Sequence, residues 1–192
     1  MKKFSIIALL LIAVILLCSC GAEKVIKADE NKNNNSSSIV NLELVSDFEA
    51  ENIYGEKLDE GIIEDNKITM INIWGTFCTP ALEEMPYIDE LYQKYSSEGF
   101  SALGIVIDAV NQDYSKKEDT VKQAQSIVED LGLTYENIIP SKELFDGEMA
   151  TNQFIPVTYF VDSNGTTLTE KYIGKRSSEE WEEIIKSLLE KQ

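Results

Sequence analysis

The 192-residue chain contains no histidine. This absence excludes Ser-His-Asp and Cys-His catalysis, histidine general bases and the common histidine-containing metal sites. Chemistry in this protein must therefore come from carboxylates, lysine, tyrosine or the three cysteines. We expect neither a metal nor another cofactor.

Basic residues are also scarce, with 17 Lys and Arg against 34 Asp and Glu and a formal net charge of −17. A nucleic-acid-binding protein neutralises phosphates with clustered Lys or Arg, and no such cluster follows the first three residues. We therefore expect no nucleic-acid partner. With 43% hydrophobic residues, the chain can bury the core of one globular domain with appendages.

The first 19 residues are typical of a signal peptide. Lys2 and Lys3 precede an apolar run, Phe4–Leu17, that is shorter than the roughly 20 residues of a membrane-spanning helix. The run ends in Leu17-Cys18-Ser19-Cys20-Gly21, which resembles a bacterial lipobox. The resemblance implies cleavage after residue 19, a lipid on the Cys20 sulfur and an acylated amino terminus. The alternatives are an uncleaved signal anchor and ordinary secretion.

Cleavage and lipidation would divide the chain into three parts. Residues 1–19 would be removed, and residues 20–40, which are polar and rich in Asn and Ser, would form a lipidated flexible tether or a partner-binding segment. Several acyl chains give a stable anchor, so we expect residues 41–192 on the extracytoplasmic face of a bacterial membrane. Cys78 would then be the one remaining thiol.

Strand-like and helix-like segments alternate in the globular part. Hydrophobic patterning predicts helices over 79–95 and 120–131 and a last helix opened by a capping box of Ser177 and Glu180. It predicts strands over 67–74, 101–108, 157–162 and 168–173, the last two joined by a tight turn. This order predicts an α/β fold with a mixed central sheet and helices on both faces.

Cys78 lies where the first core strand meets the first long helix, followed by Thr79 and Pro80. Backbone N–H groups at a helix start are unpaired and carry partial positive charge, which stabilises a thiolate. Proline suits the first helical turn. The alternative is a buried, inert cysteine.

Two motifs carry a family resemblance. The stretch Asn72–Ala81, followed by Glu84-Met85-Pro86, resembles the active-site region of thioredoxin-like proteins of the TlpA/ResA family. The stretch Phe154–Asp162 is similar to the cis-proline loop and following strand of that family. The resemblance extends from about Asp47 to the C-terminus and implies a thioredoxin-like fold.

The resemblance also implies roles for single residues. Cys78 would be the exposed nucleophile, Pro156 would be in cis beside it, and Glu84 would handle protons for the thiols. The simpler alternatives are an ordinary loop proline at 156 and a solvated helix carboxylate at 84. Trp74 would pack in the core and shape the site. The expected substrate groove comprises Trp74, Thr79, Pro80 and Ile155.

The chain departs from the family at Ala81, where the Cys-x-x-Cys motif has its second cysteine. In a dithiol enzyme that second thiol releases the mixed disulfide by intramolecular attack. Without it, Cys78 needs an external thiol, so an autonomous dithiol reductase is disfavoured. Ala81 could also be an engineered replacement that traps mixed disulfides.

Three functions remain open. The first is a monothiol redox protein that exchanges with protein or small-molecule thiols and disulfides, with the membrane electron donor that the resemblance implies. The second is a non-catalytic thioredoxin-fold module that binds a protein partner. The third is a one-cysteine thiol peroxidase, but the Pro-x-x-x-Thr/Ser-x-x-Cys pattern of such enzymes meets Ile71 and Gly75 here.

Overall fold

The computed structural model describes residues 50–142 and 154–192. The predicted signal peptide (1–19), the predicted tether (20–40) and the lipidation site Cys20 lie outside the described residues. Among the described helices, none has the length and apolar character needed to cross a membrane.

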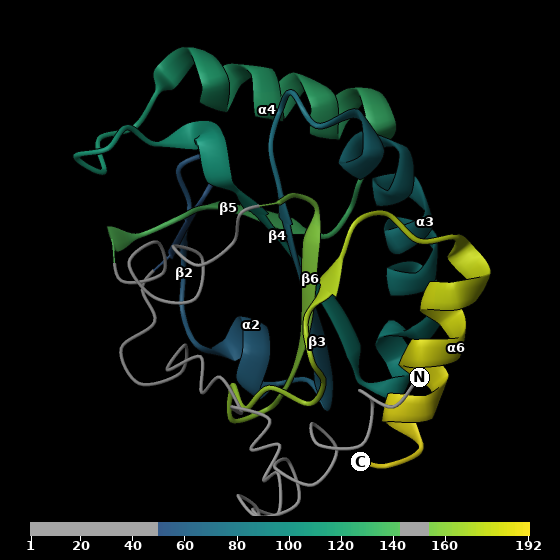
Figure 1. The fold of residues 1–192 in the computed structure, drawn as a ribbon. Helices are drawn as coiled ribbons and strands as arrows, with labels where there is room; N and C mark the ends of the chain where they lie inside the picture. The colour runs from purple at the N-terminus through teal and green to yellow at the C-terminus, as the bar shows by residue number, and fades with distance from the viewer. Residues whose placement is uncertain (1–49, 143–153) are drawn as a thin grey trace, which may run out of the picture. The chain divides into compact units, whose positions relative to one another are not determined.

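The described residues build one mixed sheet of seven strands in the order β2-β1-β5-β4-β3-β6-β7 (Figure 1). Its three central strands, β3, β4 and β5, are parallel neighbours, and the other neighbouring pairs are antiparallel. The strands are β1 (Ala50–Asn52), β2 (Lys57–Leu58), β3 (Ile68–Trp74), β4 (Phe100–Val106), β5 (Glu136–Ile139), β6 (Val157–Asp162) and β7 (Tyr172–Ile173).

Three long helices share one face of the sheet. Helix α3 (Thr79–Tyr95) connects β3 to β4, and α4 (Glu118–Leu131) connects β4 to β5. Both crossovers step in the same direction between parallel strands, and right-handed connections place such helices on the same face. Helix α6 (Ser178–Leu189) lies beside α3 (Figure 1). The short helix α2 (Gly61–Glu64) covers the opposite face.

The alternation of side chains along β3 separates the core into two sides. Met70 belongs to a buried cluster with α3 and α6, and Trp74 belongs to one with α3 and α4. Ile71 and Ile73 point the other way and pack with Ile63 of α2. The predicted α/β class, with a mixed sheet and helices on both faces, is confirmed.

Most predicted elements occur within two residues of their expected bounds. Helix α3 and strand β6 match the prediction, and Ser177 forms the predicted capping box with Glu180. The strand predicted over 168–173 is shorter, because β7 pairs with β6 only at Tyr172–Ile173. Strand β4 ends at Val106, and a 3₁₀ turn follows it.

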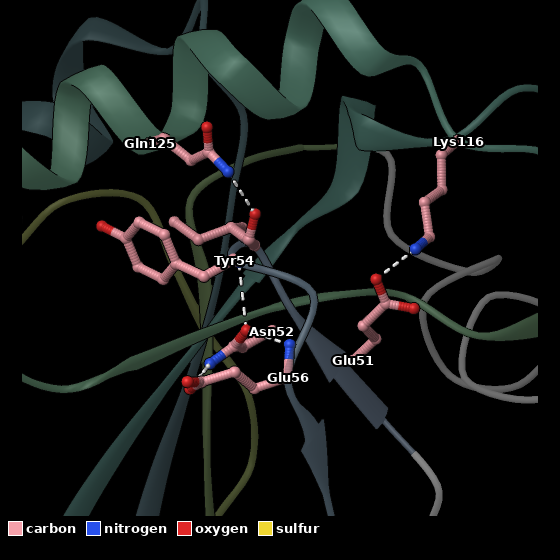
Figure 2. Close-up of polar contacts among 7 residues, drawn as sticks. Glu51, Asn52, Tyr54, Glu56, Lys116 and Gln125 are labelled. Carbon is pink, nitrogen blue, oxygen red and sulfur yellow. Dashed lines mark hydrogen bonds and ion pairs between the residues drawn. The ribbon is translucent and has the colours of Figure 1, made fainter.

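The hairpin β1–β2, which the sequence did not predict, is held by polar side chains (Figure 2). The buried Asn52 side chain donates to Glu56 and Glu136 and accepts two backbone N–H groups of the turn. Gln125 of α4 donates to the carbonyl oxygen of Ile53 at 2.6 Å. The Gln125 bond joins the β1–β2 hairpin to α4, and the Asn52 bonds join the hairpin to β5.

Candidate active site

Cys78 is the N-cap residue of α3, as the sequence predicts. Strand β3 ends at Trp74, and the chain turns into the helix through a backbone hydrogen bond from Cys78 N to Gly75 O at 2.9 Å. Pro80 lies in the first helical turn, and that turn contains no acidic residue. The unpaired N–H groups of the helix start therefore face no competing carboxylate from their own turn.

The sulfur of Cys78 faces the loop that precedes β6. Its Sγ atom lies 3.5 Å from the carbonyl oxygen of Ile155, to which a thiol can donate. The Ile155–Pro156 peptide bond is cis, so the predicted cis-proline is confirmed. The structure thus brings Cys78, Ile155 and Pro156 together.

Cys78 is less accessible than the family resemblance implies. The residue is only 8% exposed, so the expectation of an exposed nucleophile is wrong. Its neighbours Phe77 and Phe154 are 72% and 64% exposed, unusually high values for aromatic side chains. Thr79 and Pro80 are also exposed. The two loops that meet at Cys78 therefore expose two large aromatic side chains, whereas Cys78 itself is buried.

Gly75 leaves room for two apolar side chains, those of Phe77 and Ile155. A Cβ atom at position 75 would lie 3.0 Å from Phe77 Cε1 and 3.1 Å from Ile155 Cδ1. Both side chains therefore converge on the glycine from the two loops that meet at Cys78. We call Phe77, Phe154 and Ile155 the apolar rim.

Trp74 is completely buried, in the same cluster as Cys78. Its Nε1 donates to Asn137 Oδ1 at 2.9 Å, and Asn137 in turn donates to the carbonyl oxygen of Tyr135. Trp74 therefore supports the Cys78 loop from inside the core. The predicted core packing of Trp74 is confirmed, but a completely buried side chain does not line the expected substrate groove.

Glu84 is also completely buried, so the alternative of a solvated helix carboxylate is wrong. Its Oε1 accepts from Asn72 Nδ2 at 3.1 Å, and its Oε2 accepts from Arg176 N at 3.1 Å and Trp181 Nε1 at 3.2 Å. Burial raises the pKa of Glu84, and these three hydrogen bonds and the Arg176 charge oppose the rise. Glu84 thus joins α3, β3 and the start of α6.

Sequence reasoning missed three contributors to the site. Asp108 accepts from Thr76 N at 3.1 Å and from Thr76 Oγ1 at 2.7 Å, which fixes the loop before Cys78. Its position just after β4 was a usable signal, because the carboxyl ends of parallel neighbours β3 and β4 meet at one edge. Phe77 and Phe154 lie within the two motifs, but no pattern predicts that they stay exposed.

A sequence model of the AhpC/TSA family matches residues 42–170, more than half of the chain. The chain belongs to the AhpC/TSA family. The match covers Cys78 and Pro156, so the two parts of the candidate site lie inside the AhpC/TSA region.

Curated relatives and solved structures agree with this assignment. The chain is 28% identical over 185 residues to a thiol-disulfide oxidoreductase ResA of Bacillus cereus, covering 94% of this chain and 96% of the relative. It is 28% identical over 141 residues to ResA of Bacillus thuringiensis strain Al Hakam, covering 73% and 74% of the two chains. A thioredoxin-family thiol:disulfide interchange protein from Chlorobium tepidum TLS superposes with a TM-score of 0.61 at 19% identity, over 74% of this chain and 92% of that one. The fold is therefore thioredoxin-like.

Proposed function

We propose that this protein is a thiol-disulfide redox protein in which Cys78 is the single nucleophile. The observation that carries the proposal is the position of Cys78 at the N-terminus of α3, with its sulfur 3.5 Å from the carbonyl oxygen that precedes the cis-proline. The backbone N–H groups of a helix start favour negative charge, and the backbone beside Cys78 offers polar groups to an extended substrate. Relatives named thiol-disulfide oxidoreductase ResA support the same chemistry.

The proposed reaction has two steps. The Cys78 thiolate attacks one sulfur of a partner disulfide, the S–S bond breaks, and the other sulfur leaves as a thiolate. The product is a mixed disulfide between Cys78 and the partner. An external thiolate then attacks this bond and releases Cys78, because Ala81 carries no sulfur for an intramolecular attack.

The apolar rim favours partners with apolar residues beside the reacting sulfur. Phe77 and Phe154 belong to the two loops that meet at Cys78, and both are mostly exposed. Exposed aromatic surface of this kind marks an interaction site in a soluble domain. The substrates we propose are therefore extended peptide segments as well as small-molecule thiols and disulfides.

We further propose that the protein acts at the extracytoplasmic face of a bacterial membrane. The support is the signal-peptide pattern of residues 1–19, the lipobox-like Leu17-Cys18-Ser19-Cys20 and the polar tether of residues 20–40. A lipid on Cys20 would keep the domain near a membrane electron donor, which could reduce the mixed disulfide directly or through a carrier thiol.

A non-catalytic binding module is the second candidate function. Two observations favour it: Ala81 replaces a resolving cysteine, and Cys78 is only 8% exposed. In this case the apolar rim and the backbone of the cis-proline loop would bind an extended partner without turnover.

Reaction of the reduced chain with oxidised glutathione separates the two functions, with Cys18 and Cys20 replaced by Ser so that Cys78 is the one thiol. We expect intact-mass analysis to detect one glutathione adduct at Cys78, absent in Cys78→Ser and removed by added reduced glutathione. An adduct that forms only after unfolding in urea would show that the folded protein shields the sulfur. That result would leave the binding module as the function.

A further inference from the structure

Glu84 connects three elements through one buried carboxylate. It belongs to α3 and accepts from Asn72 of β3 and from the Trp181 indole of α6. Its third donor is the backbone N–H of Arg176, in the turn that connects β7 to α6. A buried carboxylate with donors on both oxygens is held in one place, and so are its donors.

The turn that Glu84 holds is connected to Cys78. Gly174, two residues before Arg176, donates its N–H to the carbonyl oxygen of Pro156 at 2.8 Å. The adjacent carbonyl oxygen, that of Ile155, faces the sulfur of Cys78. Hydrogen bonds therefore connect Glu84, the turn 174–176, the cis-proline loop and Cys78 in that order.

We propose that Glu84 is a positioning residue that fastens the turn 174–176 to α3 and thereby fixes the cis-proline loop opposite Cys78. This role differs from the proton handling that the family resemblance implies. It accounts for a buried carboxylate at position 84 in a chain whose position 81 has no thiol for that carboxylate to serve. Its effect on disulfide exchange rests on the proposed function of Cys78.

The Glu84 carboxyl group can hold the turn 174–176 in its ionised or in its neutral form. Ionised Glu84 accepts charge-assisted hydrogen bonds, which are about twice as strong as neutral ones. When Glu84 takes up a proton, one oxygen becomes a donor. Asn72 Oδ1 is buried without a donor, so a turned Asn72 amide can accept that proton. The protonated site therefore survives, but it holds the turn less tightly.

Several charged or titratable groups lie around Glu84. Arg176 and Lys175 approach from the turn before α6, and both stabilise its ionised form. Tyr135, which precedes β5, is buried and kept neutral by burial and by the charges of Asp89 and Glu84. Lys175 is also paired with Glu83, on the exposed side of the same helical turn. Glu83 therefore supplies a matched control at the same turn.

The two tryptophans of the chain provide a direct readout of the Glu84 proton. Trp181 Nε1 donates to the Glu84 carboxylate, whereas Trp74 Nε1 donates to the neutral amide of Asn137. In ¹H–¹⁵N spectra of the full chain, we expect the Trp181 indole signal to follow a one-proton transition above pH 4.5, the unperturbed glutamate value. Glu84→Gln should abolish the transition, and Glu83→Gln should preserve it.

Positioning is tested separately by amide exchange at Gly174 and by the rate of mixed-disulfide formation with oxidised glutathione at one pH. Glu84→Ala should speed Gly174 exchange and slow the reaction about threefold to tenfold. Glu84→Gln keeps one accepting oxygen but not the charge, so it should give a smaller change in the same direction. Glu83→Gln should behave as the wild type, because exposed ion pairs contribute little.

The outcomes distinguish the two proposals. If the wild type never forms the glutathione adduct, the proposed function of Cys78 is contradicted. The positioning role of Glu84 still holds in that case, provided that the Trp181 signal reports the Glu84 proton and the Gly174 amide is protected from exchange. If the wild type forms the adduct and the Glu84 variants form it equally fast, the positioning role of Glu84 is contradicted. If Glu84→Ala does not fold, Glu84→Gln and Trp181→Phe give the same comparison, because Glu84→Gln keeps one accepting oxygen and Trp181→Phe removes only one of the three donors.

Discussion

The Sγ atom of Cys78 lies 3.5 Å from the carbonyl oxygen of Ile155, 77 positions further along the chain. The sulfur is held against backbone on one side, Cys78 packs in the buried cluster that contains Trp74, and Phe77 and Phe154 are exposed in the two loops that meet at Cys78. We therefore expect a partner that reaches the sulfur to contact the side chains of Phe77 and Phe154. This geometry makes the rim a determinant of which disulfides react.

Removal of the rim should change substrate preference. We expect the double variant Phe77→Ala, Phe154→Ala to form mixed disulfides with an apolar peptide disulfide about tenfold more slowly, because it loses two aromatic contacts of about 0.5–1.5 kcal/mol each. The reaction with oxidised glutathione should change less, because glutathione has no large apolar group. Competition between the two disulfides, read by mass spectrometry, measures the preference.

Tyr54→Ala is the control for this experiment. Tyr54 is 51% exposed, comparable to the rim aromatics, and lies in the β1–β2 turn rather than in the loops at Cys78 (Figure 2). Equal slowing in Tyr54→Ala would mean that the effect comes from general surface hydrophobicity.

Glu84 should impose a pH dependence on stability. Its pKa is raised in the folded state, chiefly by burial, so the folded protein binds a proton more tightly than the unfolded chain. The Glu84 contribution is therefore most favourable below the unfolded value of 4.5 and is lost as pH rises through the folded pKa. Between the unfolded and the folded pKa, Glu84 lowers the free energy of unfolding by at most about 1.4 kcal/mol per pH unit.

Urea unfolding at several pH values measures this contribution. The free energy of unfolding of Glu84→Gln, relative to that of the wild type, should rise with pH across the window and be constant outside it. Glu83→Gln should follow the wild type throughout. A Glu84→Gln curve parallel to the wild type at every pH would show that the carboxylate titrates alike in both states.

Gly104 should be intolerant of a side chain. A Cβ atom there would lie 1.9 Å from Asn137 Oδ1 and 3.0 Å from Trp74 Nε1. Gly104→Ala must displace Asn137 and remove the partner of the buried Trp74 indole, which together should cost about 2–5 kcal/mol in urea unfolding. In an Asn137→Ala background the same change should cost much less. Additive effects of the two substitutions would contradict a direct clash.

Local pattern was enough to predict the strands and helices that carry Cys78. Helix α3 was readable because its apolar positions repeat with helical spacing between a Pro-containing start and Gly99. The capping box at Ser177 was readable because both partners lie within one turn. Strands β1 and β2 could not be predicted from the sequence, because their three and two residues are too few to show alternation.

The parts of the site that depend on packing were not predictable. Whether Glu84 is solvated or buried depends on Trp181 and Arg176, which approach from more than 90 residues away. The low exposure of Cys78 depends on Ile155 in the same way. The sequence specified which residues carry the chemistry, but long-range packing determines how far each one is from solvent.

The lifetime of the mixed disulfide tests the central claim most directly. The wild type and Ala81→Cys, both carrying Cys18→Ser and Cys20→Ser so that no other thiol is present, are each reacted with a peptide disulfide, freed of excess reagent and followed by intact mass. A single-thiol mechanism predicts that the wild-type adduct persists until an external thiol is added, whereas Ala81→Cys releases the peptide and forms a 78–81 disulfide. A wild-type adduct that decays without added thiol as fast as that of Ala81→Cys would contradict a single-thiol mechanism.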